Sequence, residues 1–423
     1  MILSLEIKNF MSFKEKTLFS FEALKKSKSK SIPEENSVVV MKDNTRINKL
    51  SVLYGANASG KSNLIKAFNF LDTFWVNIAK DKNEFIRNYA PFLLESSSEN
   101  EPSEFILIFY VNDTKHIYTL IIKENKVVSE KLEREIENKN NTLFERKDDK
   151  IVQIDEIEID NVFVKEIEAK CLQNMSFFAA YKQVNIKIKE IDDVISWHKL
   201  NWMQSITTRT ELLEYTKDTI LNDAGNIKNK ILDYIRRADF NIVNIEINQL
   251  KNKIPDELLP FFRKSELINK EAEITLNIAN FTHQVVSKND GIETHSLSEG
   301  FQSDGTIRLL GLAGIMANLL NNDAFITVDE IEASLHPKLI KFLISDFLYN
   351  SKKAQLLIAT HYDSLLEETD LIRKDSIWFT NKKSDGSTEL YSVVDFEGYR
   401  TIKSLLKAYR LGIFGATPDI VEM

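Results

Sequence analysis

Alternating apolar positions characterise the first 130 residues of the chain. Residues 3–7 carry leucine or isoleucine at every second position, which predicts a strand with one buried face. Residues 105–110 and 117–122 alternate in the same way, and the turn-forming pair Asn112–Asp113 separates them. We therefore expect an antiparallel hairpin here, within a β-rich N-terminal lobe.

The middle of the chain has a different pattern. Residues 160–240 scatter their apolar positions as helices do, but no heptad persists over several repeats, which argues against a long coiled coil. Residues 242–247 and 274–278 are expected to be strands. The Asn- and Lys-rich stretch 137–150 is expected to be an exposed loop. The lysine run at 25–30 predicts a solvated loop, with an anion-binding patch as the alternative.

Strand–helix alternation follows between residues 295 and 365, which is the pattern of a parallel α/β sheet. Residues 325–328 and 356–359 are short apolar runs of the kind that form buried strands. Residues 309–320 form the most apolar later stretch, and they are too few to cross a bilayer. We expect a buried helix there and no membrane partner.

Composition narrows the class of protein. A chain of 423 residues suffices for roughly two or three domains. The formal net charge of −8 argues against a broadly basic nucleic-acid-binding surface, although it is compatible with a local basic patch. Cys171 is the single cysteine, so the chain has no internal disulfide and suits a reducing compartment. Lys8 comes too early for a signal peptide, so we expect a cytoplasmic protein.

The most informative motif lies at Gly55–Ser62, which reads G-x-x-x-x-G-K-S, the Walker A phosphate loop. An apolar run at 50–54 precedes it and a helical pattern follows, which is the strand–loop–helix context that the motif requires. Glycines let backbone N–H groups surround phosphates. Lys61 would reach the β- and γ-phosphates, and Ser62 would ligate Mg²⁺. The residues predicted to bind ATP are Gly55, Asn57, Ala58, Ser59, Gly60, Lys61, Ser62 and Asn63.

A second motif, which is acidic, supplies the other residues that a hydrolytic site needs. The strand at 325–328 ends in Asp329–Glu330, a Walker B pattern in which Asp329 holds Mg²⁺ through water and Glu330 orients or deprotonates the attacking water. A helix-capping acidic pair is the alternative reading. The strand at 356–359 ends in His361, which can reach the γ-phosphate. The residues predicted to act in hydrolysis are Lys61, Glu330 and His361, and those predicted to hold Mg²⁺ are Ser62 and Asp329.

Two Ser-x-Gly runs precede the acidic pair, at Ser298–Gly300 and Ser303–Gly305. Each offers a hydroxyl and a glycine ahead of an apolar helix, so either could donate to a γ-phosphate from a helix N-terminus. Helix capping alone is the alternative for whichever run is not used.

The order of these motifs resembles the ABC-type ATPase heads of the SMC, RecF and OLD families. Finer features resemble the RloA-like AAA family ATPases of bacterial phage-defence and restriction loci. Those features are Ile7–Phe13, Tyr54–Ser62, Asp329–Pro337 and Tyr409–Ala416. The resemblance is specific at the two ends of the chain and thin from about 130 to 290.

The resemblance implies an α/β fold of the ABC/SMC P-loop type, with a β-rich N-terminal lobe and a mainly helical insertion. It places one half of the head in 1–130, the insertion and a partner-binding region in 131–290, and the other half in 291–423. In such families two heads sandwich ATP, and each supplies a Ser-x-Gly signature to its partner. We therefore expect a homodimer or higher oligomer.

The resemblance also assigns particular residues. The family pattern Ser-x-Gly-Thr fits Ser303 and Gly305, which we take as the signature. Ser334 and His336 would occupy the D-loop, which crosses to the partner head. A metal role for His336 is not expected, because no paired histidine stands at ligand spacing.

The resemblance further implies a separately encoded effector. OLD proteins carry a Toprim nuclease, whose chemistry needs a D-x-D cluster, and this chain has no D-x-D. RloA-like ATPases are usually encoded beside a small, often Toprim-like effector. The expected role is a sensor or regulator in abortive infection.

The sequence also bears on other functions. A RecF-like DNA-repair ATPase acting directly on DNA is the alternative. The long insertion and Ile331–Glu332 count against a transporter subunit. The absence of an Asp from Asn381–Ser384 counts against a GTPase.

Overall fold

A computed structural model describes residues 1–25, 34–154, 161–222, 226–238, 241–253, 273–288 and 291–417. The chain divides into two compact units whose boundaries differ from the three segments expected from the sequence. The first unit comprises Met1–Thr208, Asn322–Glu332 and Ile344–Met423, and the second comprises Arg209–Asn321 and Ala333–Leu343. Of the lysine run, only Lys25 lies within the described residues.

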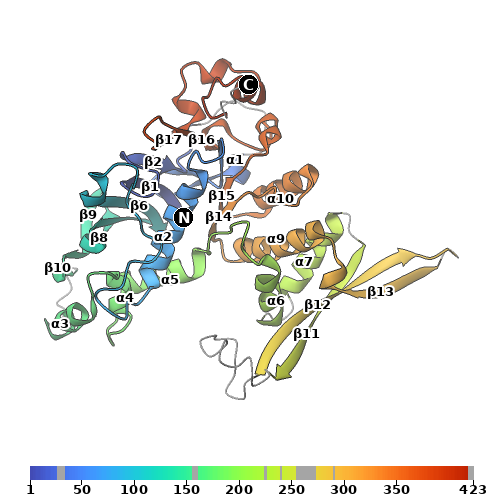
Figure 1. Cartoon of the computed structure of the whole chain (residues 1–423), viewed down its shortest axis with the longest axis horizontal. Helices are drawn as coiled ribbons and strands as arrows, with labels where there is room; N and C mark the ends of the chain where they lie inside the picture. Colours follow the sequence, from blue (N-terminus) through green and yellow to red (C-terminus); the bar gives the residue numbers. More distant parts are fainter. Residues whose placement is uncertain are drawn as a thin grey trace. The chain divides into compact units, whose positions relative to one another are not determined.

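The first unit contains a seven-stranded antiparallel sheet in the order β10-β9-β8-β7-β6-β1-β2 (Figure 1). The β6–β7 pairing confirms the expected hairpin, and Asn112 and Asp113 form its turn with φ values of 49° and 63°. The strands are β1 (Ile2–Lys8), β2 (Thr17–Ser20), β6 (Ser103–Val111), β7 (Thr114–Lys123), β8 (Lys126–Ile136), β9 (Lys139–Lys147) and β10 (Lys150–Ile154).

The prediction of an exposed loop at 137–150 is wrong, because Lys139–Lys147 form β9. This strand pairs with β8 and buries Leu143 and Phe144. The ring of Phe144 stacks on that of Phe177 with centroids 3.9 Å apart. Tertiary packing on one face therefore outweighs a local composition typical of loops.

A five-stranded sheet, ordered β14-β15-β5-β16-β17, carries the motifs of interest. Its first four strands are mutually parallel, and β17 is antiparallel to β16. The strands expected at 325–328 and 356–359 are confirmed. The members are β5 (Leu50–Gly55), β14 (Phe325–Asp329), β15 (Gln355–Ala359), β16 (Ile377–Lys382) and β17 (Thr388–Ser392), and a separate pair is formed by β3 (Val38–Val40) and β4 (Arg46–Asn48).

Helix α2 (Lys61–Val76) lies between the seven-stranded and the five-stranded sheet of this unit (Figure 1). Phe70 packs against Phe105 of β6, with ring centroids 5.0 Å apart, and Phe68 packs against Phe325 of β14 at 5.1 Å. A helix buried on both sides is fixed in position, and so is the loop that precedes it. The unit also contains α1 (Glu34–Ser37), α3 (Asn161–Lys170), α4 (Phe177–Tyr181), α5 (Lys189–Asn201) and α11 (Leu405–Arg410), while α10 (Pro337–Asn350) spans the unit boundary in sequence.

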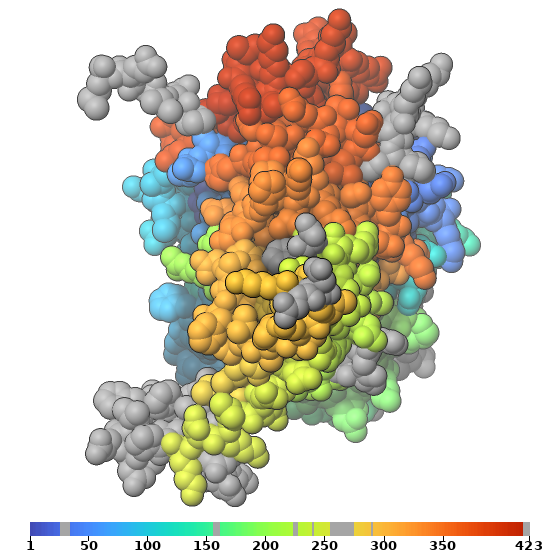
Figure 2. All heavy atoms as spheres, turned by 90° about the vertical axis from the view of Figure 1, so that its right-hand side faces the viewer, coloured from blue at the N-terminus to red at the C-terminus, as the bar shows by residue number. Residues whose placement is uncertain are grey.

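In its described residues, the second unit combines helices with a three-stranded antiparallel sheet, β11-β12-β13. The apolar stretch at 309–320 is the buried helix expected there, and Gly311 and Gly314 let α6 pack closely against it. Figures 1 and 2 show β11 and β12 projecting from the helices as a long arm. The elements are α6 (Leu212–Asn222), α7 (Asn226–Arg237), α9 (Asp304–Asn321), β11 (Ile242–Lys253), β12 (Glu273–Val286) and β13 (Ile292–Ser298).

The region expected to be a mainly helical insertion is therefore mixed. Helices α3, α5, α6 and α7 confirm the helical reading of 160–240, and β11 and β12 confirm the two strands expected after it. Strands β8 to β10 extend the sheet of the first unit instead. Within the described part of the chain, no helix has the length and apolarity needed to span a membrane.

Candidate nucleotide site

The phosphate loop occupies residues 56–60, between the end of β5 and the start of α2. Gly60 has a φ of 113°, which side chains rarely tolerate, and a Cβ there would overlap Thr388. A Cβ at Gly55 would overlap Thr380. Both glycines are thus required by the fold of the loop, because the β16–β17 hairpin packs directly against its backbone.

The Lys61 ammonium lies across this loop. It donates to the carbonyl oxygens of Gly55 at 2.9 Å and Ala56 at 3.1 Å. Burial lowers the pKa of Lys61 to about 8, against the raising influence of three nearby carboxylates, Asp329, Glu332 and Glu330. A buried cation bonded to neutral carbonyls gains from an anionic partner, which a triphosphate would supply.

Hydroxyl groups from distant parts of the chain form hydrogen bonds that hold the loop in place, and we call this set the loop brace. The Thr388 hydroxyl lies 2.8 Å from the Ser59 carbonyl oxygen and 2.7 Å from the Ser12 hydroxyl. The Ser59 and Thr380 hydroxyls are 2.6 Å apart, and the Asn63 amide donates to Ser12 at 2.7 Å. Sequence reasoning missed Ser12, Thr380 and Thr388. Of these three residues, only Ser12 could have been found from the sequence, because it lies within the Ile7–Phe13 motif.

The Walker B residues reach the same edge of the sheet. Because β14, β15 and β5 are parallel neighbours, their carboxyl ends lie side by side, and Ala359 pairs with both Asp329 and Leu53. Asp329 is buried, whereas Glu330 is exposed with a φ of 51°, and its N–H donates to the Ala359 carbonyl at 2.9 Å. The structure therefore brings Asp329 and Glu330 beside the loop that holds Lys61.

Glu332 occupies a position that the sequence analysis did not assign to the site. Its carboxylate accepts one hydrogen bond from the Thr360 hydroxyl and another from the His361 N–H, each of 2.6 Å. Burial, and then the charge of Lys61, lower the pKa of His361. Glu332 thus fixes the backbone that carries the exposed His361 side chain, next to Lys61 and the acidic pair.

The donor set fits Mg²⁺ bound together with a nucleotide. Mg²⁺ in nucleotide enzymes takes one or two protein oxygens and completes its shell with phosphates and water. The exposed Ser62 hydroxyl at the start of α2 and the Asp329 carboxylate at the end of β14 provide such oxygens. Among the described residues, no group of three or more His, Cys, Asp or Glu side chains could hold a metal ion.

The two Ser-x-Gly runs lie in the second unit and differ in their surroundings. Ser303 precedes the 18-residue helix α9 and accepts a hydrogen bond from the Thr306 N–H at 3.1 Å. Ser298 precedes only the 3₁₀ turn Glu299–Phe301, and Glu299 binds the buried Lys217 ammonium at 2.7 Å. The Ser298 run is thus tied into the packing of its own unit. This difference favours Ser303 as the signature, which stays a prediction.

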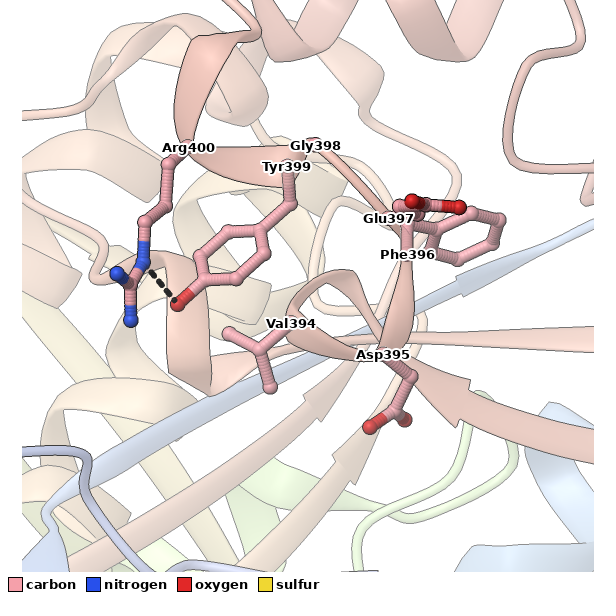
Figure 3. Close-up of a pocket in the computed structure, with 7 residues that line it drawn as sticks. All are labelled: Val394, Asp395, Phe396, Glu397, Gly398, Tyr399 and Arg400. Carbon is pink, nitrogen blue, oxygen red and sulfur yellow. Dashed lines mark hydrogen bonds between the residues drawn. The ribbon is translucent and has the colours of Figure 1, made fainter.

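A separate pocket of about 380 Å³ is formed by the contiguous segment Val394–Arg400 (Figure 3). The Arg400 guanidinium donates to the Tyr399 hydroxyl at 3.2 Å along one side. None of the candidate nucleotide residues lines this pocket, and we assign it no role in the site.

Residues 50–367, three quarters of the chain, match a family model described as "AAA domain, putative AbiEii toxin, Type IV TA system". The chain belongs to this family. It is therefore an AAA-type ATPase, and the matched residues include the Gly55–Ser62 segment and strand β14. No curated protein matches the chain.

Solved structures similar to this AAA ATPase include SMC heads. One is the SMC head domain from Thermotoga maritima, with 14% identity and a TM-score of 0.40 over 93% of this chain and 98% of that one. Another is an SMC head bound to the C-terminal winged-helix domain of ScpA, with 14% identity and a TM-score of 0.43 over 96% and 99%. A third, an SMC head from Pyrococcus furiosus bound to the ScpA C-terminal domain, has 13% identity and a TM-score of 0.40 over 97% and 98%.

Proposed function

We propose that this chain is the Mg²⁺-dependent, ATP-hydrolysing regulatory subunit of a bacterial anti-phage system, in which it controls a separately encoded, Toprim-like nuclease. The observation that carries the ATPase part is the convergence of Lys61, Asp329, Glu330 and His361 at the carboxyl ends of the parallel strands β5, β14 and β15. The family description names a putative toxin of a type IV TA system, which supports a role in a multi-component defence locus.

Each residue then has a chemical role. The loop N–H groups and Lys61 bind the β- and γ-phosphates, and Ser62 with Asp329 holds Mg²⁺, which neutralises charge on the phosphates. Glu330 orients the attacking water and accepts its proton. His361 donates toward the γ-phosphate. The Glu332 carboxylate accepts a hydrogen bond from the backbone N–H of His361 and so holds His361 in position.

We propose that hydrolysis requires a second head, whose Ser303 and Gly305 close over the γ-phosphate. Ser303→Arg should then leave ATP binding nearly unchanged and lower hydrolysis by about 100-fold or more, because the larger cationic side chain blocks the opposite phosphate. Equilibrium ATP binding and steady-state phosphate release measure the two effects.

The matched control is Ser298→Arg, which places the same side chain five residues earlier, in the run tied to Lys217. It should retain most of the activity. An inactive Ser298→Arg beside an active Ser303→Arg would shift the signature to the first run.

The effector part of the proposal rests on the missing nuclease chemistry. The sequence has no D-x-D pair, and Toprim catalysis needs such carboxylates to hold its metal. The purified chain should hydrolyse ATP slowly and cut no nucleic acid. Co-expressed with the product of the neighbouring reading frame, it should form a stable complex, and phage protection should require both genes together with Lys61 and Glu330.

Two results would refute the separate effector. One is purified chain that degrades DNA by itself. The other is phage protection by this gene alone, which would favour a RecF-like ATPase that acts directly on DNA.

A further inference from the structure

The C-terminal segment of the first unit combines basic and apolar side chains on its surface. Residues 398–417 include four basic residues and no Asp or Glu, although the whole chain has a net charge of −8. Leu411 and Ile413 are 67% and 57% exposed. Lys403, Lys407, Arg410, Leu411 and Ile413 all lie at the surface, and we call them the tail patch.

The backbone under the tail patch is fixed by packing. The rings of Tyr409 and Phe414 both stack on Phe379 of β16, with centroid distances of 5.7 and 4.7 Å. Gly412 has a φ of 70°, and the Ile413 N–H donates to the Ala408 carbonyl at 3.1 Å. Phe414 is thus buried and Tyr409 half-buried, while the aliphatic side chains of Leu411 and Ile413 between them are exposed, which is a preorganised arrangement for binding.

The tail patch is also bonded to the segment that follows His361. The Arg410 guanidinium donates to both carboxylate oxygens of Asp363, at 2.7 and 3.1 Å. Asp363 begins the 3₁₀ turn Asp363–Glu367, two residues after His361. Arg410 therefore joins the tail patch to a segment that is continuous with the candidate γ-phosphate sensor.

We propose that the tail patch docks an acidic, leucine-bearing segment of a partner protein. Exposed aliphatic side chains suit a protein ligand, because phosphate groups gain nothing from them. Arg410 is already paired with Asp363, so the exposed Lys403 and Lys407 are the cations that select a peptide with Asp and Glu. This inference rests on the proposed function in one respect: that function supplies the effector as the partner.

A synthetic peptide tests the tail patch directly. The probe is a labelled 12-residue peptide rich in Glu and Leu, with a Glu and Ser peptide of equal charge as its control. Fluorescence anisotropy at physiological salt should show binding of the first peptide only. The double variant Leu411→Ser/Ile413→Ser and the variant Lys407→Glu should each weaken binding by about tenfold. The first removes apolar contact with the bound peptide, and the second removes a cation that pairs with its carboxylates.

The control variant is Leu250→Ser/Leu276→Ser, which changes a cross-strand pair on the β11–β12 arm, each residue being 47% exposed. It should bind the peptide as the native chain does, and all variants should keep their ATPase activity. Equal peptide binding by the patch variants would overturn the proposal, and so would displacement of the peptide by duplex DNA.

Co-purification with the neighbouring gene product separates this inference from the proposed function. The patch variants should lose that complex while the arm variant keeps it. A native chain that binds the peptide but no neighbouring product would refute the effector part of the proposed function and leave the docking surface standing.

Discussion

Lys61→Ala should weaken ATP binding by roughly 100-fold or more, because removing one partner of a desolvated charge pair costs about 3 kcal/mol. Lys61 is buried, and its ammonium donates to the loop carbonyls of Gly55 and Ala56, so the variant loses a cation placed against the loop backbone. Calorimetric titration with ATP and Mg²⁺ measures the loss.

Lys66→Ala is the matched control, because Lys66 is an exposed lysine on the same helix. It should bind ATP like the native chain. Ordinary ATP binding by Lys61→Ala would exclude the phosphate-loop assignment.

The lowered pKa of Lys61 gives this binding a pH dependence of defined sign. Below its pKa of about 8 the ammonium is already charged, so ATP affinity should vary little with pH. Above that value the free lysine is neutral and must take up a proton to bind phosphate, so affinity should fall by up to about tenfold per pH unit. Titrations between pH 7 and 9.5 in buffers of different ionisation enthalpy should show this proton uptake.

Glu330→Gln should lower hydrolysis by about 100- to 1,000-fold while changing ATP affinity only slightly, because it removes the proposed general base and spares Asp329. The ATP-bound dimer of heads should accumulate as a result. Single-turnover hydrolysis and size-exclusion chromatography with ATP measure the two effects.

Glu332→Gln provides the comparison. Its carboxylate already accepts hydrogen bonds from Thr360 and His361, so it serves to position His361, and the amide can still accept one of the two. We expect about a tenfold loss of rate. In a His361→Ala background the Glu332 change should add little, since its effect acts through His361. If Glu332→Gln abolished ATP hydrolysis while Glu330→Gln retained it, the general base would be Glu332.

The amino-acid sequence by itself determined the parts of this protein that are local in the chain. The phosphate loop lies between its strand and its helix within a single run, so the motif and its context can be read together. The β6–β7 hairpin follows from alternation around one turn, and α9 from continuous apolarity. The parallel strands β14 and β15 follow from short apolar runs, within a region whose strand–helix alternation predicts a parallel sheet.

Only the tertiary structure decided the features that depend on distant partners. Strand β9 forms despite its Asn- and Lys-rich start, because Phe144 packs against Phe177 and Arg146 forms a buried ion pair with Glu130. The loop brace joins Ser12 to Thr388 across 376 positions of sequence. A hydroxyl or a carboxylate has no periodicity of its own that predicts such a partner. Its role is set by which backbone and side chains the fold places within hydrogen-bonding distance, and that is information about packing.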